Sequence, residues 1–405
     1  MNFMADFSFE ILAKEKNSRA RAALIKTRNG VIETPYLIPV ATEGSIRGLT
    51  PNHLRELGVQ CILANTYHLH LRPGDELVKK VGGLHSFTKF SGPIVTDSGG
   101  FQAFSLGLGK EHGASKIGFF PGNKRINDKN KEKKLAVVTD QGVKFRSIYD
   151  GSSHFIGPKE SMEIQANLGA DIIMAFDECT SPFSDYEYTK MANERTHKWA
   201  IESLEHHDKN QALYGIIQGG YFEDLRKEST QYIKSLPFEG IAIGGSLGKN
   251  KEDMHKILDW ITPQLDEERP RHMLGIGYIN DIFECVERGI DSFDCVSLTR
   301  EARNGRLYVH PESGGNLENK FSINIRNACY ASDFSPIDKL CRCPTCKDYN
   351  RAELRHLNNV REKNLSYYSL ATIHNLYFML NLMKEIRENI KDGTFNDLKK
   401  RWLGN

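Results

Sequence analysis

Short apolar runs that each end in polar residues or glycines recur along this chain, and their recurrence constrains the fold more than any other feature. The runs are rich in β-branched residues and predict buried strands. They are CILANTYH from Cys61, PIVTDSGG from Pro93, DIIMAFDE from Asp171, LYGIIQGG from Leu213, GIAIGGS from Gly240, HMLGIG from His272 and DSFDCV from Asp291. Amphipathic segments with a helical period separate them, at 158–170, 222–236, 251–265 and 280–290. Such alternation predicts a (β/α)8 barrel, and a doubly wound open sheet is the alternative.

Polar side chains follow the predicted strands at equivalent places. They are Asn65, Asp97, Asp177, Gln218 and Asp294. A helix N-cap would account for a single aspartate in such a place, such as Asp97 in VTDSGGFQ. In a barrel, however, the carboxyl ends of all strands open into one mouth, so these side chains converge. Several carboxylates and amides at one mouth indicate a functional site rather than a set of caps.

The composition excludes a membrane-embedded chain and does not indicate any other class of partner. The 405 residues are 39% hydrophobic, so the chain can bury a large core. The formal net charge is only +2, which gives no overall attraction to nucleic acid. No apolar run is as long as a membrane span, and the opening residues carry charges where a signal peptide has its apolar core. We therefore expect a cytoplasmic protein without a membrane partner.

Two stretches depart from the repeating pattern. Residues from about 109 to 141 are polar and lysine-rich, which predicts a solvated loop or hairpin inserted on the rim of the barrel. A weaker alternative is contact with a phosphate backbone. The basic residues concerned are Lys124, Arg125, Lys129, Lys131, Lys133 and Lys134. After Asn304 the pattern gives way to a cysteine cluster and long helices, whose apolar stripe predicts core or a subunit interface.

The sequence CRCPTC brings Cys341, Cys343 and Cys346 close enough together to bind one metal ion. Three thiolates and one imidazole make a closed tetrahedral zinc site, and such a site is structural because no position is left for water. His356 and His374 are the candidates for the fourth ligand. His374 lies on the amphipathic helix that can return to the cluster across a helical hairpin. Crowded thiols in a reducing compartment otherwise have little reason to occur together.

Taken together, these segments resemble the tRNA-guanine transglycosylase family almost from end to end. The motifs are NTYHLHLRPG from Asn65, TDSGGFQAFSLG from Thr96, FRSIYDGSSHFIGPKESMEIQ from Phe145, FDECT from Phe176, GIIQGG from Gly215, FDCVSLTREARNG from Phe293 and the CxCxxC with its distal histidine. The resemblance implies an irregular (β/α)8 TIM barrel over residues 1–310 and a zinc-binding helical subdomain over 311–405. It also implies exchange of guanine at the wobble position of tRNAs with a GUN anticodon for a 7-deazaguanine, on the way to queuosine.

Base exchange with retained configuration at C1′ needs two displacements, so one carboxylate has to form a covalent glycosyl-enzyme. By resemblance Asp294 is this nucleophile, and Asp97 is the acid and base, oriented by Asn65. The resemblance also implies that the purine is held by Ser98, Asp177, Gln218, Gly244 and Gly245, with Phe101 and Leu274 on its faces. It implies that Asp281, Arg300 and Arg303 contact the tRNA. It finally implies a structural Zn2+ on Cys341, Cys343, Cys346 and His374, and a homodimer formed through the same region.

The segment GGSLGKN, Gly244 to Asn250, departs from the bacterial pattern GGLAVGE. Gly248 stands where bacterial members have a valine, and Asn250 stands where they have a glutamate. Eukaryotic members, which accept queuine, also have glycine at the valine position. This departure favours queuine over 7-aminomethyl-7-deazaguanine as the incoming base.

Three other interpretations remain open at this point. Paired carboxylates on a barrel also serve glycoside hydrolases, but these would not need arginines that read an anticodon. A non-catalytic accessory subunit is disfavoured because both Asp97 and Asp294 are present. A paralogue that exchanges a base in DNA, or at another tRNA position, is disfavoured by FDECT and TREARNG without being excluded.

Overall fold

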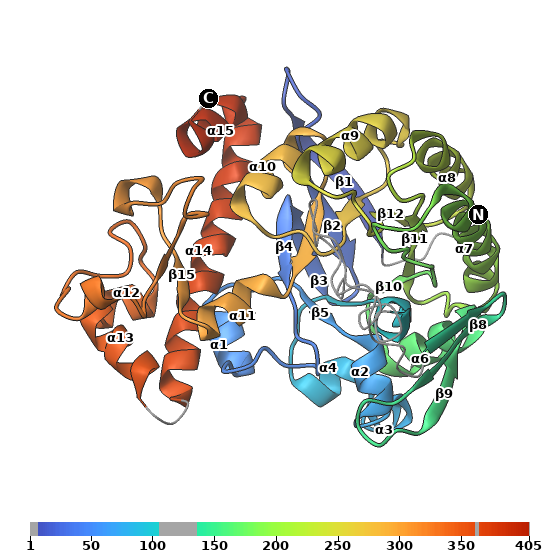
Figure 1. The fold of residues 1–405 in the computed structure, drawn as a ribbon, viewed down its shortest axis with the longest axis horizontal. Coiled ribbons are helices and arrows are strands. Elements are labelled where there is room, and N and C mark those ends of the chain that lie inside the picture. The colour runs from blue at the N-terminus through green and yellow to red at the C-terminus, as the bar shows by residue number, and fades with distance from the viewer. Residues whose placement is uncertain (1–6, 105–135, 361–363, 405) are drawn as a thin grey trace.

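The centre of the molecule is a barrel of eight parallel strands (Figure 1). A computed structural model describes residues 7–104, 136–360 and 364–404. In their order around the barrel, the strands are β4 (Tyr36–Pro39), β5 (Ile62–Ala64), β6 (Ile94–Thr96), β10 (Ile172–Met174), β11 (Ala212–Ile217), β12 (Gly240–Ile243), β13 (Arg271–Met273) and β14 (Ser292–Cys295). Every predicted strand is therefore present. β4 adds an eighth that the polar-turn pattern did not reveal.

The two ends of this sheet meet just beyond β4. Val40 and Leu63 form a parallel bridge, and the Ala41 amide donates to the Leu63 carbonyl at 2.7 Å. The bridge joins β4 to β5, so the sheet closes on itself instead of remaining open. The predicted barrel is confirmed, and the doubly wound alternative is wrong.

Helices follow most of the strands and cover the outside of the barrel. The predicted amphipathic segments form α6 (Pro158–Leu168), α8 (Glu223–Ser235), α9 (Lys251–Ile261) and α10 (Ile279–Glu287). The others are α1 (Pro51–Glu56), α2 (Thr66–Leu71), α3 (Asp75–Lys80), α4 (Gly83–Thr88), α7 (Tyr186–His206), α11 (Ser297–Arg303) and a 3-10 turn at Thr262–Gln264. Residues 100–104 are also helical. The longest of these barrel helices, α7, was not among the predicted segments.

Two three-stranded antiparallel sheets lie outside the barrel, in addition to a two-stranded one formed by β15 (Arg306–Tyr308) and β16 (Ser322–Asn324) near the C-terminal helices. The first joins β1 (Ser8–Lys14), β2 (Arg21–Thr27) and β3 (Gly30–Thr34), and its Ile25 and Ile32 pack in one cluster with inward-facing barrel residues. The second joins β7 (Ala136–Thr139), β8 (Gly142–Arg146) and β9 (Ser153–Ile156). The last residues of the predicted lysine-rich insertion thus belong to this second sheet. Its six named basic residues lie outside the described residues.

The part of the chain after the barrel is built around one long helix, α14 (Leu365–Asp392). Figure 1 shows α14 running between the barrel and the segment that carries α12 and α13. The helix packs against β1, β2 and β4 and against α11 and α12. Its predicted apolar stripe is mostly core, because Leu376, Met383 and Ile386 are buried, whereas Leu365 is exposed. The remaining elements are β15 (Arg306–Tyr308), β16 (Ser322–Asn324), α12 (Pro344–Asp348), α13 (Arg351–Asn359), α15 (Phe395–Leu403) and 3-10 turns at Pro311–Ser313 and Ala328–Tyr330.

Candidate active site and metal centre

A cavity of about 300 Å³ opens at the carboxyl ends of the barrel strands. Its lining includes most of the side chains that the strand-end pattern predicted to converge. The predicted residues in its wall are Asp97, Ser98, Phe101, Asp177, Gly245, Leu274, Asp294 and Arg300. A larger hollow of about 410 Å³ lies between His310 and Trp402 and contains none of the predicted residues. The barrel mouth is therefore the candidate active site.

Asp97 follows β6 and is held in place by several donors. Its Oδ1 accepts from the backbone amides of Thr66 at 2.9 Å and Gly99 at 3.2 Å, and its Oδ2 accepts from the Asn65 amide. Desolvation in the cavity raises the pKa of Asp97 to about 7, and the nearby charge of Asp294 adds to the rise, although these hydrogen bonds oppose it. A carboxyl group with this pKa exchanges a proton readily near neutral pH. Asn65 also caps α2, because it accepts from the His68 amide at 3.0 Å.

Asp294 lies on β14 and, like Asp97, lines the cavity. Its side chain is 15% exposed. Its Oδ1 accepts from the Gly275 amide at 3.1 Å and contacts His272 Nε2 at 3.2 Å. Among the described residues, nothing donates to its Oδ2. One carboxylate oxygen is therefore fixed by the protein, and the other is available to a ligand.

Asp177 and Gln218 form a buried pair between β10 and β11. Asp177 accepts from Gln218 Nε2 at 2.6 Å and from Ser98 Oγ at 3.3 Å. Burial raises the pKa of Asp177 to about 6, and both hydrogen bonds oppose the rise. Gln218 Oε1 is buried without a partner among the described residues. The pair thus supplies carboxylate and amide oxygens that can accept hydrogen bonds from a ligand.

The two glycines after β12 have different places. A Cβ on Gly244 would lie only 2.2 Å from Gln218 Nε2, so glycine is required for this close approach. The Gly244 amide is used within the sheet, where it donates to the Ile217 carbonyl at 2.9 Å. Gly245 lines the cavity itself. Of the two predicted backbone contacts, only Gly245 therefore faces the site.

Arg226 on α8 is a structural element of the site that the sequence did not reveal. It is fully buried, and its hydrogen bonds go to backbone carbonyls rather than to a carboxylate. It donates to the carbonyls of Ile217 at the end of β11 at 3.1 Å, of Gly220 after β11 at 2.8 Å and of Gly245 after β12 at 3.0 Å. Burial lowers its pKa to about 10, so the guanidinium is charged at neutral pH. One side chain thus ties together the loops that follow two neighbouring strands.

Gly248 and Asn250 do not face the cavity in the way that the sequence comparison suggested. Gly248 has φ +85°, and a Cβ built on it would lie 2.2 Å from the Asp253 Cβ, toward α9. The Asn250 side chain caps α9 and accepts from the Asp253 amide at 2.8 Å. The glycine is therefore explained by its backbone conformation and by α9, and it does not by itself widen the base pocket.

The residues predicted to contact tRNA lie in three different environments. Arg300 on α11 lines the cavity. Arg303 is half-buried, and burial together with the charges of Arg47 and Arg300 lowers its pKa. Its Nη1 is buried without a partner among the described residues. Asp281 is buried on α10, and its Oδ1 pairs with Lys251 Nζ at 2.7 Å. The two arginines lie near enough for their charges to interact, whereas Asp281 lies beneath the surface.

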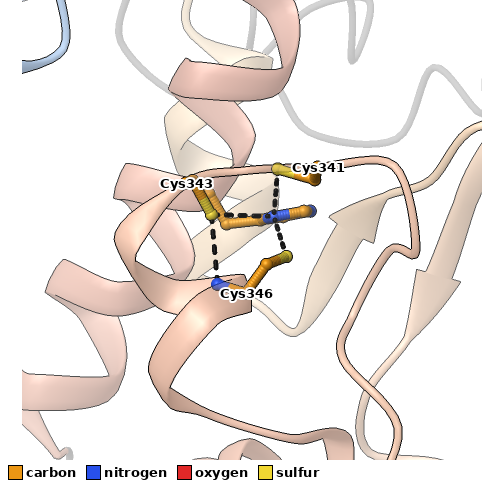
Figure 2. A group of neighbouring side chains, drawn as sticks. Cys341, Cys343 and Cys346 are labelled. Carbon is orange, nitrogen blue, oxygen red and sulfur yellow. Dashed lines mark hydrogen bonds between the residues drawn. The ribbon is translucent and has the colours of Figure 1, made fainter.

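Cys341, Cys343, Cys346 and His374 come together in the second half of the chain. Figure 2 shows the three cysteine side chains pointing toward one another. The sulfur atoms lie 3.7, 3.6 and 3.3 Å from His374 Nδ1. Zinc bonds to sulfur and imidazole nitrogen place the two ligand types roughly 3.5 Å apart on a tetrahedron. All four residues are buried, and His356, the other candidate, is exposed. The cluster can therefore hold a metal ion, and its donors suit zinc.

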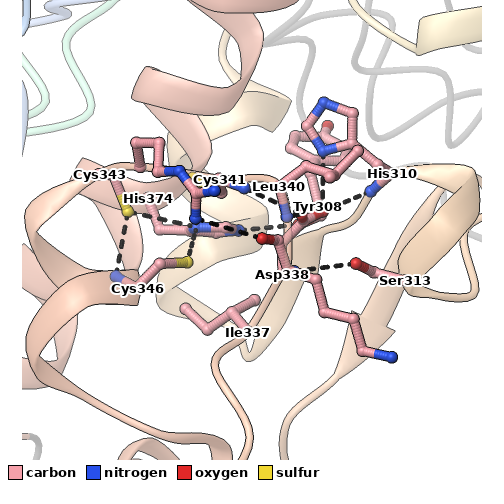
Figure 3. Close-up of polar contacts among 12 residues, drawn as sticks. Tyr308, His310, Ser313, Ile337, Asp338, Leu340, Cys341, Cys343, Cys346 and His374 are labelled. Carbon is pink, nitrogen blue, oxygen red and sulfur yellow. Dashed lines mark hydrogen bonds and ion pairs between the residues drawn. The ribbon is translucent and has the colours of Figure 1, made fainter.

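The surroundings of this cluster orient its ligands (Figure 3). His374 Nε2 contacts the Tyr308 carbonyl at 2.8 Å, so it carries the hydrogen and leaves Nδ1 free to bind a metal. Asp338 Oδ1 accepts from the Cys341 amide at 3.1 Å, and its Oδ2 contacts His310 Nδ1 at 2.9 Å. Burial acts to raise the pKa of Asp338, but the contacts with His310 prevail and lower it to about 2. The cluster is thus fixed by groups that do not themselves bind the ion.

Comparison with known proteins agrees with the arrangement of the barrel mouth and the cluster. The family model described as queuine tRNA-ribosyltransferase matches residues 16–405. The chain belongs to the queuine tRNA-ribosyltransferase family. A putative queuine tRNA-ribosyltransferase of Archaeoglobus fulgidus is 55% identical over 397 residues, which cover 96% of this chain and 98% of the relative. A queuine tRNA-ribosyltransferase of Roseiflexus sp. is 44% identical over 410 residues, which cover 98% and 99% of the two chains.

Membership of the queuine tRNA-ribosyltransferase family confirms the resemblance found in the sequence and makes this protein a pentosyl-transferring enzyme. A third relative, from Caldanaerobacter subterraneus, is 42% identical over 403 residues, which cover 99% of this chain and 98% of the relative. Across the part of the chain that the structure describes, no helix is both long and apolar enough to span a membrane.

Proposed function

We propose that this enzyme exchanges guanine at the wobble position of tRNAs with a GUN anticodon for a 7-deazaguanine, through a covalent intermediate on Asp294. One observation carries the proposal: Asp97 and Asp294 line a single cavity, and they differ in their surroundings. The first is enclosed by donors and has a pKa of about 7, whereas the second has one oxygen without a donor among the described residues. Two carboxyl groups in different environments suit two different chemical roles.

In the first displacement, Asp294 Oδ2 attacks ribose C1′. A C–O bond forms, the C1′–N9 bond breaks, and the electron pair of that bond leaves with guanine. Asp97 gives its proton to the departing base. In the second displacement, the Asp97 carboxylate takes the N9 proton of the incoming base, whose nitrogen attacks C1′ and releases Asp294. The two inversions retain the configuration at C1′, as in retaining glycosidases.

The base is held while these steps occur. Guanine has N–H donors at N1 and N2, and the oxygens of Asp177 and Gln218 can accept from them. Phe101 and Leu274 both line the cavity and can cover the two faces of the ring. A base in this pocket has left its own stack, and this is feasible because the anticodon loop is single-stranded. Arg300 and Arg303 can then contact the neighbouring nucleotides.

The C-terminal cluster has a structural role in this proposal. Zinc on Cys341, Cys343, Cys346 and His374 would be fully coordinated, so it would supply folding free energy and no open position for chemistry. The exposed apolar side chains of Phe334 and Leu365 in the same region support a homodimer. We propose that residues 1–310 and 311–405 form two domains, with α14 packed against both the barrel strand β4 and α12.

Queuine remains the favoured incoming base, with 7-aminomethyl-7-deazaguanine second. The support comes from the sequence pattern of the segment 244–250 alone. The structure adds none, because a side chain at position 248 would point toward Asp253. A Gly248→Val variant would strain the loop and is unsuitable as a test. Direct competition of the two bases against labelled guanine in tRNA is the appropriate measurement. A much higher kcat/KM for the aminomethyl base than for queuine would reverse the preference.

The nucleophile is tested by trapping the intermediate. Wild-type enzyme incubated with tRNA, in the absence of an incoming base, should give a protein–RNA adduct that survives denaturation. Asp294→Asn should give no adduct and no incorporation of labelled guanine, while Asp392→Asn, an exposed change at the end of α14, should behave as wild type. An adduct of undiminished yield in Asp294→Asn would refute the assignment.

A further inference from the structure

His272 is a buried histidine that touches one of the two carboxylates and has no place in the reaction described above. It lies on β13, is 1% exposed and faces the interior of the barrel. Its Nε2 lies 3.2 Å from Asp294 Oδ1, and its Nδ1 lies 2.9 Å from Ser292 Oγ. Both nitrogens are therefore bonded, and both partners belong to the neighbouring strand β14.

The geometry of parallel strands explains why an imidazole fits this place. His272 and Ser292 are register partners, and Asp294 lies two residues further along β14 on the same face. Two residues of strand rise roughly 6.6 Å, a separation that a ring with a polar atom at each end can bridge. The surrounding interior is apolar, with Ile38, Ala242 and Leu274 in its cluster. An imidazole in such surroundings would be costly unless both nitrogens were bonded.

The chemistry of the contact fixes the position of one proton. An ionised carboxylate can only accept, so His272 Nε2 has to carry the hydrogen in its bond to Asp294. With Nε2 protonated, a neutral ring accepts at Nδ1 from the Ser292 hydroxyl. The Gly275 amide donates to the same carboxylate oxygen at 3.1 Å. Oδ1 is thus held by two donors, whereas Oδ2 receives none from the described residues.

We propose that His272 is a positioning residue for the nucleophile, and that Ser292 orients its ring. This inference rests on the proposed function, because it assumes that Asp294 attacks C1′. By binding Oδ1, His272 restricts rotation of the carboxylate and directs Oδ2 into the cavity. The imidazole transfers no proton in the reaction. Its effect therefore falls on formation of the C–O bond and leaves binding of the tRNA unchanged.

The experiment measures adduct formation in a single turnover, alongside tRNA affinity and melting temperature. His272→Phe keeps a ring in the barrel interior but removes the donor, and we expect adduct formation to slow about 10- to 100-fold at an unchanged Kd for tRNA. His272→Gln can place an amide N–H near the former Nε2 and should recover most of the rate. Ser292→Ala should give a smaller loss, because the ring remains and loses only one of its two bonds.

His207→Phe is the matched control, since His207 is also buried but bonds to the Leu204 carbonyl on α7, outside the cavity. It should form the adduct at the wild-type rate. An unchanged rate in His272→Phe would overturn the inference, as would a loss of tRNA binding and melting temperature that His272→Gln does not restore. Failure of the proposed function itself has a different signature, which is adduct formation by Asp294→Asn.

Discussion

The barrel mouth and the C-terminal cluster are both built from polar residues in low-dielectric surroundings, but they satisfy those residues in opposite ways. In the cluster, three sulfurs and one imidazole nitrogen face each other within 4.8 Å, and a single ion would complete them. At the mouth, Asp97, Asp177 and Asp294 are spread around a cavity of about 300 Å³. Gln218 Oε1 has no partner there among the described residues. The first site is closed, and the second keeps acceptors for a ligand.

This difference indicates how each region affects the free energy of unfolding. A closed metal site converts the binding of an ion into stability. An open cavity does the reverse, because it keeps carboxyl groups desolvated, as the raised pKa values of Asp97 and Asp177 show. Substitutions in the cluster should therefore reduce stability before activity. Substitutions in the cavity should reduce activity and leave stability unchanged or improved.

The largest effect is expected from Cys343→Ser. Cys343 is fully buried, its sulfur accepts from the Cys346 amide at 3.2 Å, and serine is a poor zinc ligand. We expect loss of the bound metal and a destabilisation of at least about 3 kcal/mol, seen as a low yield of folded protein. Metal analysis and thermal unfolding are the measurements. The exposed Cys329→Ser is the control and should retain one metal ion per chain. Full stability of Cys343→Ser without metal would remove the distinction between the two regions.

The next effect is the loss of proton transfer in Asp97→Asn. The asparagine oxygen can still accept from the Thr66 and Gly99 amides, so the loop should keep its shape. Base exchange should fall by roughly two to four orders of magnitude, while tRNA binding is retained. Incorporation of labelled guanine and a filter-binding assay measure the two quantities. Exchange within tenfold of wild type would exclude Asp97 as the acid and base.

A third prediction concerns the same residue and the dependence of stability on pH. Because the folded pKa of Asp97 is raised to about 7, folding favours its protonated form. Its contribution to stability is complete below the ordinary aspartate pKa of about 3.9 and is lost progressively as the pH rises from there through 7. The free energy of unfolding of Asp97→Asn, relative to that of wild type, should therefore increase by about 2–3 kcal/mol from pH 5 to pH 8. Urea unfolding at both pH values measures this, and a constant difference between the two proteins would contradict it.

The smallest effect is expected at Arg303, whose charge interacts with that of the cavity residue Arg300. Burial and the charges of Arg47 and Arg300 disfavour the guanidinium of Arg303 in the free enzyme. Arg303→Gln should therefore not lower the melting temperature. It should weaken tRNA binding by about 1–2 kcal/mol and reduce the dependence of affinity on salt by about one phosphate contact. Binding isotherms at several salt concentrations give both values. An unchanged salt dependence would place Arg303 away from the RNA backbone.

Local patterns allowed much of this molecule to be predicted. The strand ends placed Asp97, Asp177 and Asp294 at one mouth, because in a parallel barrel all strand ends share one face. The CxCxxC spacing located three of the four cluster residues, since it fixes distances within a few residues. His374, some 28 residues beyond Cys346, needed the helix to be placed, and His356 remained an alternative until the structure showed its exposure.

Long-range packing accounts for what was missed. In the sequence, Arg226 looks like any other polar residue of an amphipathic helix, and only the fold shows that it donates to carbonyls after two different strands. The role of Gly248 was inferred by comparison with the bacterial and eukaryotic patterns. The direction in which a side chain at this position would point depends instead on the positive φ and on the position of Asp253. β4 was not predicted because no polar site residue of the kind used to find the other strands follows it. In each case the deciding partner is supplied by another element.

Helix α14 has a consequence for how the chain folds as it is synthesised. Two consecutive residues of this helix act on different parts of the molecule: His374 completes the cluster, and Asn375 accepts from the Tyr308 amide at 3.1 Å and donates to the Leu298 carbonyl of α11 at 3.2 Å. The same helix covers β4, the first strand of the barrel. Because residues 365–392 emerge from the ribosome late, the first barrel strand waits for nearly the whole chain before its outer face is covered. Until then, neither the cysteines nor α11 has its partner on α14, so both the cluster and the packing of α11 are completed only after all the barrel strands have been synthesised.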